Sequence, residues 1–313
     1  TADATGTTVI GTAAGAAITS GQANTAIGFQ ALLAEDDGDF NTAVGYKALT
    51  AQTGTSGETS NTAVGYQAAV ALTIGRYNVV IGKNALQTDD VGDSTVAIGQ
   101  NTFQLQNSDS DNESTGNTGV GYQVAPYNVT GTNNTLIGYQ AGLGASGQSH
   151  SHNTVVGMNA LLSVTTGSSN VVIGKQAGDS ITDGGENVII GDGTAQTTTS
   201  LANAVIIGRG AAQNGNITTA ANGTVAVGYK ALEALTSGIK NTAVGFEALK
   251  STTEGDYNTA IGYQALSTTD FDNEGENVAV GYKSMDLATD AQNNVAVGNQ
   301  TMGGETLTGA FNV

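Results

Sequence analysis

Residues 41–49 read NTAVGYKAL, residues 61–69 read NTAVGYQAA and residues 258–266 read NTAIGYQAL. Variants of the first five letters occur seventeen times, from the copy that ends at Gly11 to the copy that ends at Gly298. Eleven of the sixteen intervals between successive motif glycines are 17 residues, and the other five are 19 to 22 residues. A short, fixed period is typical of one supersecondary unit stacked many times, so the repeat predicts a solenoid.

We number each repeat from its motif glycine, which is position 0. Position −1 is Val or Ile and position −3 is Thr or Val in all seventeen copies. Because β-branched residues at every second position are typical of a strand, the sequence predicts an all-β fold, a parallel β-solenoid with one coil per repeat. We expect a single domain over residues 1–313, with short terminal segments 1–6 and 299–313. In four of the copies, the defining residues at −4, −1 and 0 are Asn41, Val44 and Gly45; Asn61, Val64 and Gly65; Asn241, Val244 and Gly245; Asn258, Ile261 and Gly262.

Position −2 lies on the opposite face of the predicted strand. It is Ala, Val, Ile or Leu in sixteen copies and Gly119 in the remaining one. A strand that is apolar on both faces is buried on both faces. We therefore expect the −3 and −1 side chains to face inward, and the face with position −2 and the motif glycine to pack against another chain.

Two further positions have structural interpretations. Position −4 is Asn in thirteen of seventeen copies. Asn favours turns, and stacked Asn side chains form hydrogen-bonded ladders, so we expect a structural role. The motif glycine predicts a corner or a close approach of two backbones.

The residues after the glycine vary more. Position +1 is Tyr or Phe in nine copies, and Ala and Leu often follow at +3 and +4. We interpret this segment as a second short strand whose aromatic residues form a packing column; a carbohydrate-stacking stripe is the alternative. The extra residues of the longer repeats fall in the polar stretch that closes the coil, which predicts surface loops along one edge.

Composition limits the partners. The net charge of −18 disfavours binding to nucleic acid and to anionic membranes. No apolar stretch approaches the roughly 20 residues of a membrane span, so we expect no membrane insertion. The chain has no cysteine, so we expect neither a disulfide framework nor a thiolate metal site. It begins with Thr1, which indicates a processed product or an excised segment.

No catalytic motif is evident, and we expect a protein that is not an enzyme and has no cofactor other than, as a candidate, calcium. Asp109, Asp111 and Glu113 alternate in the longest interval and form the candidate calcium site; a solvated acidic loop is the alternative. His150 and His152 form an H-x-H pair of the kind that binds metals, but the sequence offers no third ligand nearby.

The phrases NTAVGYKAL, NTAVGYQAA and NTAIGYQAL resemble repeats in the heads of trimeric autotransporter adhesins and in phage-type fibre proteins. The resemblance covers nearly the whole chain. It implies a left-handed parallel β-roll that is usually trimeric and whose chains pack through small residues of the repeat.

The expected function is therefore that of a structural subunit of an extracellular, cell-surface or virion fibre built from stacked solenoids. The expected partners are copies of the chain, as a trimer or an end-to-end polymer. One alternative is an adhesin head that contacts a host glycan or protein through its edge loops. A second is an ice-binding solenoid, although the Thr residues at −3 would have to face outward for that role.

Overall fold

A computed structural model describes residues 5–54, 57–110, 113–215, 217, 222–268, 275–288 and 292–303. Parts of both predicted terminal segments, residues 1–4 and 304–313, lie outside this set. The regular secondary structure of the described residues is entirely β, and none of their segments is a helix that could cross a membrane. The chain divides into two compact units, Thr1–Asn153 and Thr154–Val313, which we describe separately. The single domain over residues 1–313 stays a prediction.

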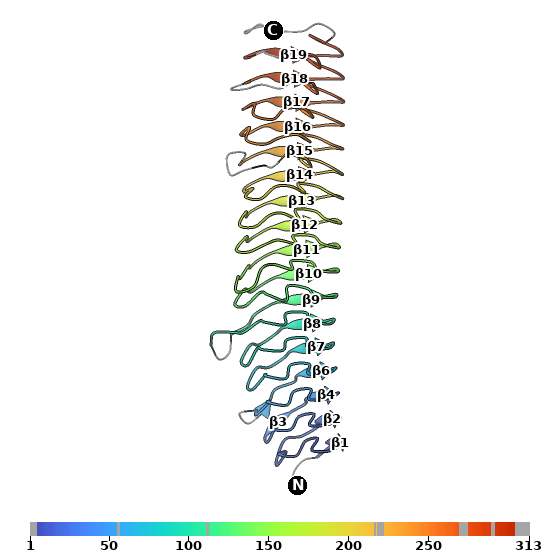
Figure 1. Cartoon of the computed structure of the whole chain (residues 1–313), viewed down its shortest axis with the longest axis vertical. Helices are drawn as coiled ribbons and strands as arrows, with labels where there is room; N and C mark the ends of the chain where they lie inside the picture. Colours follow the sequence, from blue (N-terminus) through green and yellow to red (C-terminus); the bar gives the residue numbers. More distant parts are fainter. Residues whose placement is uncertain are drawn as a thin grey trace. The chain divides into compact units, whose positions relative to one another are not determined.

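In the first unit, eight three-residue strands follow one another along the chain (Figure 1). Each pairs in parallel with the next, so that equivalent repeat positions lie side by side, as Thr8 does with Thr25 and Thr25 with Thr42. A second, two-stranded sheet pairs β3 (Gly38–Asp39) with β5 (Gly57–Glu58). The eight strands are β1 (Thr8–Ile10), β2 (Thr25–Ile27), β4 (Thr42–Val44), β6 (Thr62–Val64), β7 (Val79–Ile81), β8 (Val96–Ile98), β9 (Thr118–Val120) and β10 (Thr135–Ile137).

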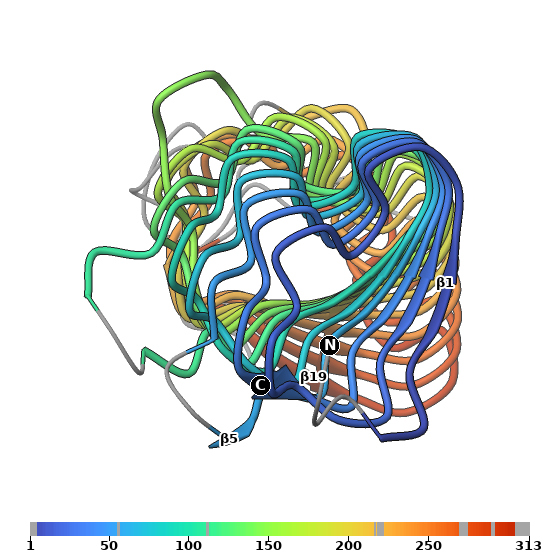
Figure 2. The same cartoon turned by 90° about the horizontal axis from the view of Figure 1, so that it is seen from below.

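The second unit repeats this arrangement with nine strands. Their parallel register again follows the repeat, as in the pairing of Val171 with Val188 and of Thr242 with Thr259. Seen end on, successive coils within each unit follow a common outline (Figure 2). The predicted parallel β-solenoid is therefore confirmed. The nine strands are β11 (Thr154–Val156), β12 (Val171–Ile173), β13 (Val188–Ile190), β14 (Val205–Ile207), β15 (Val225–Val227), β16 (Thr242–Val244), β17 (Thr259–Ile261), β18 (Val278–Val280) and β19 (Val295–Val297).

The strands face the opposite way from our prediction. Their middle residues, at position −2, point into the coil, and Ala43, Ile189 and Ala243 have no exposed surface. Their first and third residues, at −3 and −1, point outward, and 40% of Ile261 is exposed. The predicted interchain contact through position −2 is wrong, because the coil's own interior already covers these side chains.

The side chains at positions −2 and +4 lie against each other inside the coil. A small residue at position −2 therefore leaves room for a large one at position +4. Where −2 is Ala, +4 is commonly Leu, as in Ala43 and Leu49. Where −2 is large, +4 is often Gly or Ala, as in Leu136 and Gly142. In most coils the pair therefore keeps the interior volume nearly constant, as a close-packed core requires, although Ala63 with Ala69 and Val80 with Leu86 depart from this pattern.

The segment after the motif glycine is a turn, so the predicted second strand is wrong. Positions +2 and +4 adopt left-handed backbone angles, with φ of +55° at Lys47 and +49° at Leu49. Such angles cost a non-glycine residue about 1–2 kcal/mol. The turn is held from both sides, because the Lys47 N–H donates to the Phe29 carbonyl at 2.9 Å and the Leu49 N–H donates to the Ala68 carbonyl at 3.1 Å.

The predicted roles of the motif glycine and of the Asn at −4 are confirmed. Gly65 has a φ of +141°, and a Cβ on it would lie 2.6 Å from the carbonyl oxygen of Gly82 in the next coil. The Asn side chains form a buried ladder: Asn61 Oδ1 accepts hydrogen bonds from the Asn78 backbone N–H at 2.9 Å and from Asn78 Nδ2 at 3.2 Å. The same pattern recurs at Asn258 and Asn277 in the second unit.

Candidate functional site

The first and third residues of the three-residue strands form what we call the outer strand face of each unit. Every residue at these two positions is Thr, Val or Ile, so the face carries no charged side chain. These side chains are half-buried or exposed, and Ile81, Ile137 and Ile173 each expose more than a third of their surface. Sequence analysis identified the residues but assigned them to the interior, because an apolar strand gives no sign of which face points inward.

Threonine is distributed unevenly over this face. Six of the eight first residues in the first unit are Thr, whereas six of the nine in the second unit are Val. Thr25, Thr42 and Thr62 are direct neighbours on three successive strands. Part of the face therefore combines a row of hydroxyl groups with a parallel row of Ile and Val side chains.

The aromatic residues at +1 form stacked columns, which confirms the predicted packing role. The rings of Tyr46 and Tyr66 lie 5.1 Å apart at 7°, and those of Phe246 and Tyr263 lie 5.1 Å apart at 8°. Each ring within a column faces another ring, although about 40–50% of the Tyr66 and Tyr263 side chains remains exposed. This arrangement disfavours the carbohydrate-stacking alternative, which needs free ring faces.

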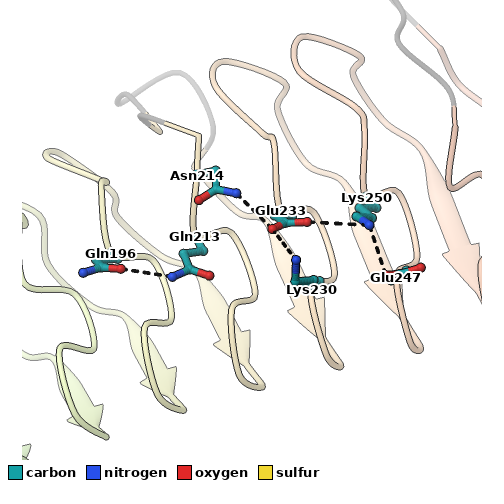
Figure 3. A network of polar contacts seen from close by, with 7 residues as sticks. All are labelled: Gln196, Gln213, Asn214, Lys230, Glu233, Glu247 and Lys250. Atoms are coloured by element: carbon teal, nitrogen blue, oxygen red, sulfur yellow. Dashed lines mark hydrogen bonds and ion pairs between the residues drawn. The ribbon is translucent and has the colours of Figure 1, made fainter.

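Polar side chains at +2 and +5 form a second set of contacts between coils (Figure 3). Glu233 accepts a hydrogen bond from Asn214 Nδ2 at 2.9 Å and pairs with Lys230 Nζ at 2.9 Å. Lys250 Nζ lies 3.9 Å from Glu233 and 3.0 Å from Glu247. The charges of this network are already balanced among its members, so we assign it to coil-to-coil packing, where such partly exposed pairs contribute about 1 kcal/mol each.

The interior of the first unit contains buried acids that the sequence analysis did not identify. Glu35 and Asp89 occupy position +7, where other coils have Leu72 or Ile181, and neither acid has any exposed surface. Burial raises the pKa of both carboxyl groups, against hydrogen bonds that lower it. The apolar residues at +7 in other coils were the signal that these acids point inward.

The hydrogen bonds of Asp89 come from residues of the longest interval between motif glycines. Its carboxylate accepts hydrogen bonds from the Ser108 N–H at 3.2 Å and the Ser108 hydroxyl at 3.3 Å, and from Gln106 Nε2 at 3.2 Å. The start of this interval therefore packs inside the coil, because its polar side chains supply donors that a buried carboxylate needs.

The structure separates the two histidines. His150 is buried: its Nε2 contacts the Gly142 carbonyl at 3.3 Å and its Nδ1 contacts Asn153 Nδ2 at 3.3 Å. This burial lowers the pKa of His150 to about 4. His152 is exposed and has a φ of +60°. The H-x-H pair is therefore not a joint metal site, because one ring is already bonded inside the coil.

The candidate calcium site is only partly described. The Asp109 N–H donates to Glu113 Oε2 at 3.0 Å, so the Glu113 carboxylate has a hydrogen-bond partner within the protein. Asp111 lies outside the described residues. Within the described part of the chain, no cluster of three or more His, Cys, Asp or Glu side chains could hold a metal ion. Calcium binding here stays a prediction.

No protein-family model matches this chain, and a search of curated proteins gave no match either.

Proposed function

We propose that the protein is a structural subunit of a fibre, and that its copies pack side by side through the outer strand face. The single observation that carries this proposal is the composition of the face: two outward positions in all seventeen repeats hold no residue other than Thr, Val and Ile. The faces of parallel sheets are usually covered on both sides, yet among the described residues of this chain only the inner face is covered.

A second copy of the chain suits this face better than an unrelated partner. The chain has a net charge of −18, so two copies repel each other over most of their surfaces. The outer strand face does not contribute to that repulsion, because it carries no charged side chain. Two copies also share the same spacing between coils, so rows of Val and Ile from one copy can pack in register with rows from another. The proposed extracellular or virion location rests on the resemblance of the repeat.

Sedimentation of the full chain with matched variants tests this proposal. Ile173→Glu places a charge on the outer strand face, where 37% of the native side chain is exposed. Thr166→Glu adds the same charge at an exposed position of the same unit, outside the strands. We expect the wild type and Thr166→Glu to form the same assembly and Ile173→Glu to shift toward monomer, with all three keeping their β circular dichroism. A wild-type protein that sediments as a monomer at micromolar concentration would refute side-by-side packing.

One observation favours ice binding as a second candidate function. The Thr residues at −3 point outward, which removes the obstacle that the sequence suggested, and Thr25, Thr42 and Thr62 form an in-register row. We expect an ice-binding protein to show thermal hysteresis that Thr42→Lys reduces without loss of β structure. Absence of both thermal hysteresis and ice shaping in the wild-type protein would eliminate this candidate.

A further inference from the structure

Three pairs of tyrosines on neighbouring coils lie in contact, ring against ring. The ring centroids are 5.1 Å apart in Tyr46–Tyr66, 5.3 Å in Tyr122–Tyr139 and 5.3 Å in Tyr263–Tyr282. The interplanar angles are 7°, 14° and 11°. All six rings are also exposed to solvent, with between 39% and 48% of each side chain accessible.

The backbone fixes these pairs in place. Tyr46 and Tyr66 both follow the motif glycine of their repeat, and the strands before them pair in register, Val44 beside Val64. Hydrogen bonds from the Gly65 N–H to the Val44 carbonyl and from the Gln67 N–H to the Tyr46 carbonyl, both 2.8 Å, flank the pair. The two phenols therefore meet at a high effective concentration whatever the concentration of the protein.

We propose that these three pairs are sites of oxidative cross-linking, at which a dityrosine bond joins one coil to the next. One-electron oxidation of each phenol, with loss of its proton, gives a tyrosyl radical with spin density on the ring carbons ortho to the oxygen. Two such radicals form a carbon–carbon bond between ortho carbons, and the two ring hydrogens then move to the oxygens as the rings regain aromaticity. With hydrogen peroxide as the oxidant, used by a haem peroxidase, two phenols and one peroxide give one dityrosine and two molecules of water.

The structure also predicts which tyrosines do not cross-link. Tyr77 and Tyr257 have no stacked ring partner among the described residues, although 50% and 42% of their side chains are exposed. Tyr229 stacks on Phe246 at 5.0 Å, and Phe has no phenolic hydroxyl from which to form the radical. Exposure alone would treat Tyr77 and Tyr257 like the three pairs, so the distribution of cross-links separates pairing from exposure.

A cross-link at these positions ties consecutive coils together. The chain between the joined residues is short, since Tyr46 and Tyr66 are 20 positions apart and Tyr122 and Tyr139 are 17. A covalent link between two points of a chain restricts the unfolded state, as a disulfide does. The cross-linked protein should therefore unfold at a higher temperature. This inference does not depend on the proposed association between copies.

The test uses the full chain, photo-oxidised with ruthenium trisbipyridyl and persulfate. A mixture of ¹⁵N-labelled and unlabelled protein is digested, and mass spectrometry identifies the joined peptides. We expect links within one chain at the three pairs, each at least tenfold more abundant than any link through Tyr77 or Tyr257, and a higher melting temperature. Tyr66→Phe should abolish the Tyr46–Tyr66 link and leave the other two, and Phe246→Tyr should add a link to Tyr229 or Tyr263.

Two results would overturn the proposal. One is dityrosine spread over the exposed tyrosines, including Tyr77 and Tyr257, without preference for the pairs. The other is formation of tyrosyl radicals, detected by electron paramagnetic resonance, without any link within a chain. Because Tyr66→Phe keeps the aromatic ring and its stacking, loss of the link in that variant cannot be attributed to misfolding.

Discussion

Leu136 fills the space inside its coil that Gly142 leaves open. A Cβ on Gly142 would lie 3.3 Å from both terminal methyl groups of Leu136. In the coil of Ala43 and Leu49 the sizes of the two side chains are reversed, and both are fully buried. Positions −2 and +4 thus share one volume, and the sequence divides it differently from coil to coil.

This relationship predicts strong coupling between the two positions. Leu136→Ala should cost about 2–5 kcal/mol because it leaves a cavity, and Gly142→Leu about 1–3 kcal/mol because it overfills the coil. The double variant reproduces the pattern of Ala43 and Leu49 and should be more stable than either single variant. Urea denaturation of the four proteins measures the coupling, and additive losses would show that the two positions do not share a volume.

Neighbouring residues on opposite faces should respond differently to the same charge. Ala243 is buried inside the coil, whereas Val244 lies on the outer strand face. Ala243→Glu buries an unpaired charge and should unfold the coil or lower its melting temperature sharply. Val244→Glu should keep the melting temperature of the isolated subunit and weaken its association. Calorimetry and sedimentation measure the two effects, and identical behaviour of the two variants would contradict the observed orientation of the strand.

The contrast between these two residues shows what the sequence could predict and what it could not. The period of the repeat predicted the strands, their parallel register and the Asn ladder, because each follows when equivalent repeat positions of successive coils lie next to one another. The inward direction of Ala243 did not follow, since Thr, Val and Ile on one face and Ala on the other are all compatible with burial. The left-handed turn at Lys47 and Leu49 was mistaken for a strand because positive φ is uncommon for residues other than Gly, so neither residue type indicates the turn.

His150 should make the first unit sensitive to acid. Its Nδ1 faces the amide nitrogen of Asn153 and its Nε2 faces a carbonyl, so the neutral ring is bonded on both sides. Its pKa of about 4 in the folded state lies below the ordinary histidine value of 6.5. The contribution of neutral His150 to the free energy of unfolding is therefore complete above pH 6.5. It is lost as the pH falls toward 4, by roughly 3 kcal/mol in total.

Replacement of the histidine isolates this contribution. Glu35 and Asp89 have raised pKa values, so their contributions have the opposite sign: they favour the folded state at low pH and diminish as the pH rises. Both the wild type and His150→Leu contain Glu35 and Asp89. The contributions of these two acids therefore cancel in the difference in stability between the two proteins. We expect that difference to change with pH between 6.5 and 4. Urea titrations of the two proteins across this range measure it, and a difference that does not change with pH would contradict the burial of a neutral His150 ring.

A motif glycine is needed for two reasons, its positive φ and the close approach of the next coil. Gly65 and Gly147 both have positive φ, +141° and +76°. A Cβ on Gly65 would lie 2.6 Å from the Gly82 oxygen, whereas a Cβ on Gly147 would meet nothing within 4 Å. Gly147→Ala should therefore cost only the strain of a left-handed backbone, about 1–2 kcal/mol.

Gly65→Ala should cost considerably more, about 4 kcal/mol or above, because such losses accompany a change that the surroundings cannot absorb. The methyl group forces the coils of Gly65 and Gly82 apart and lengthens the hydrogen bond from the Gly82 N–H to the Val64 carbonyl, now 2.8 Å. Hydrogen exchange at the Gly82 amide should accelerate in Gly65→Ala and remain unchanged in Gly147→Ala. If the two variants lose equal stability, the backbone angle alone accounts for the glycine and the close approach of the coils does not.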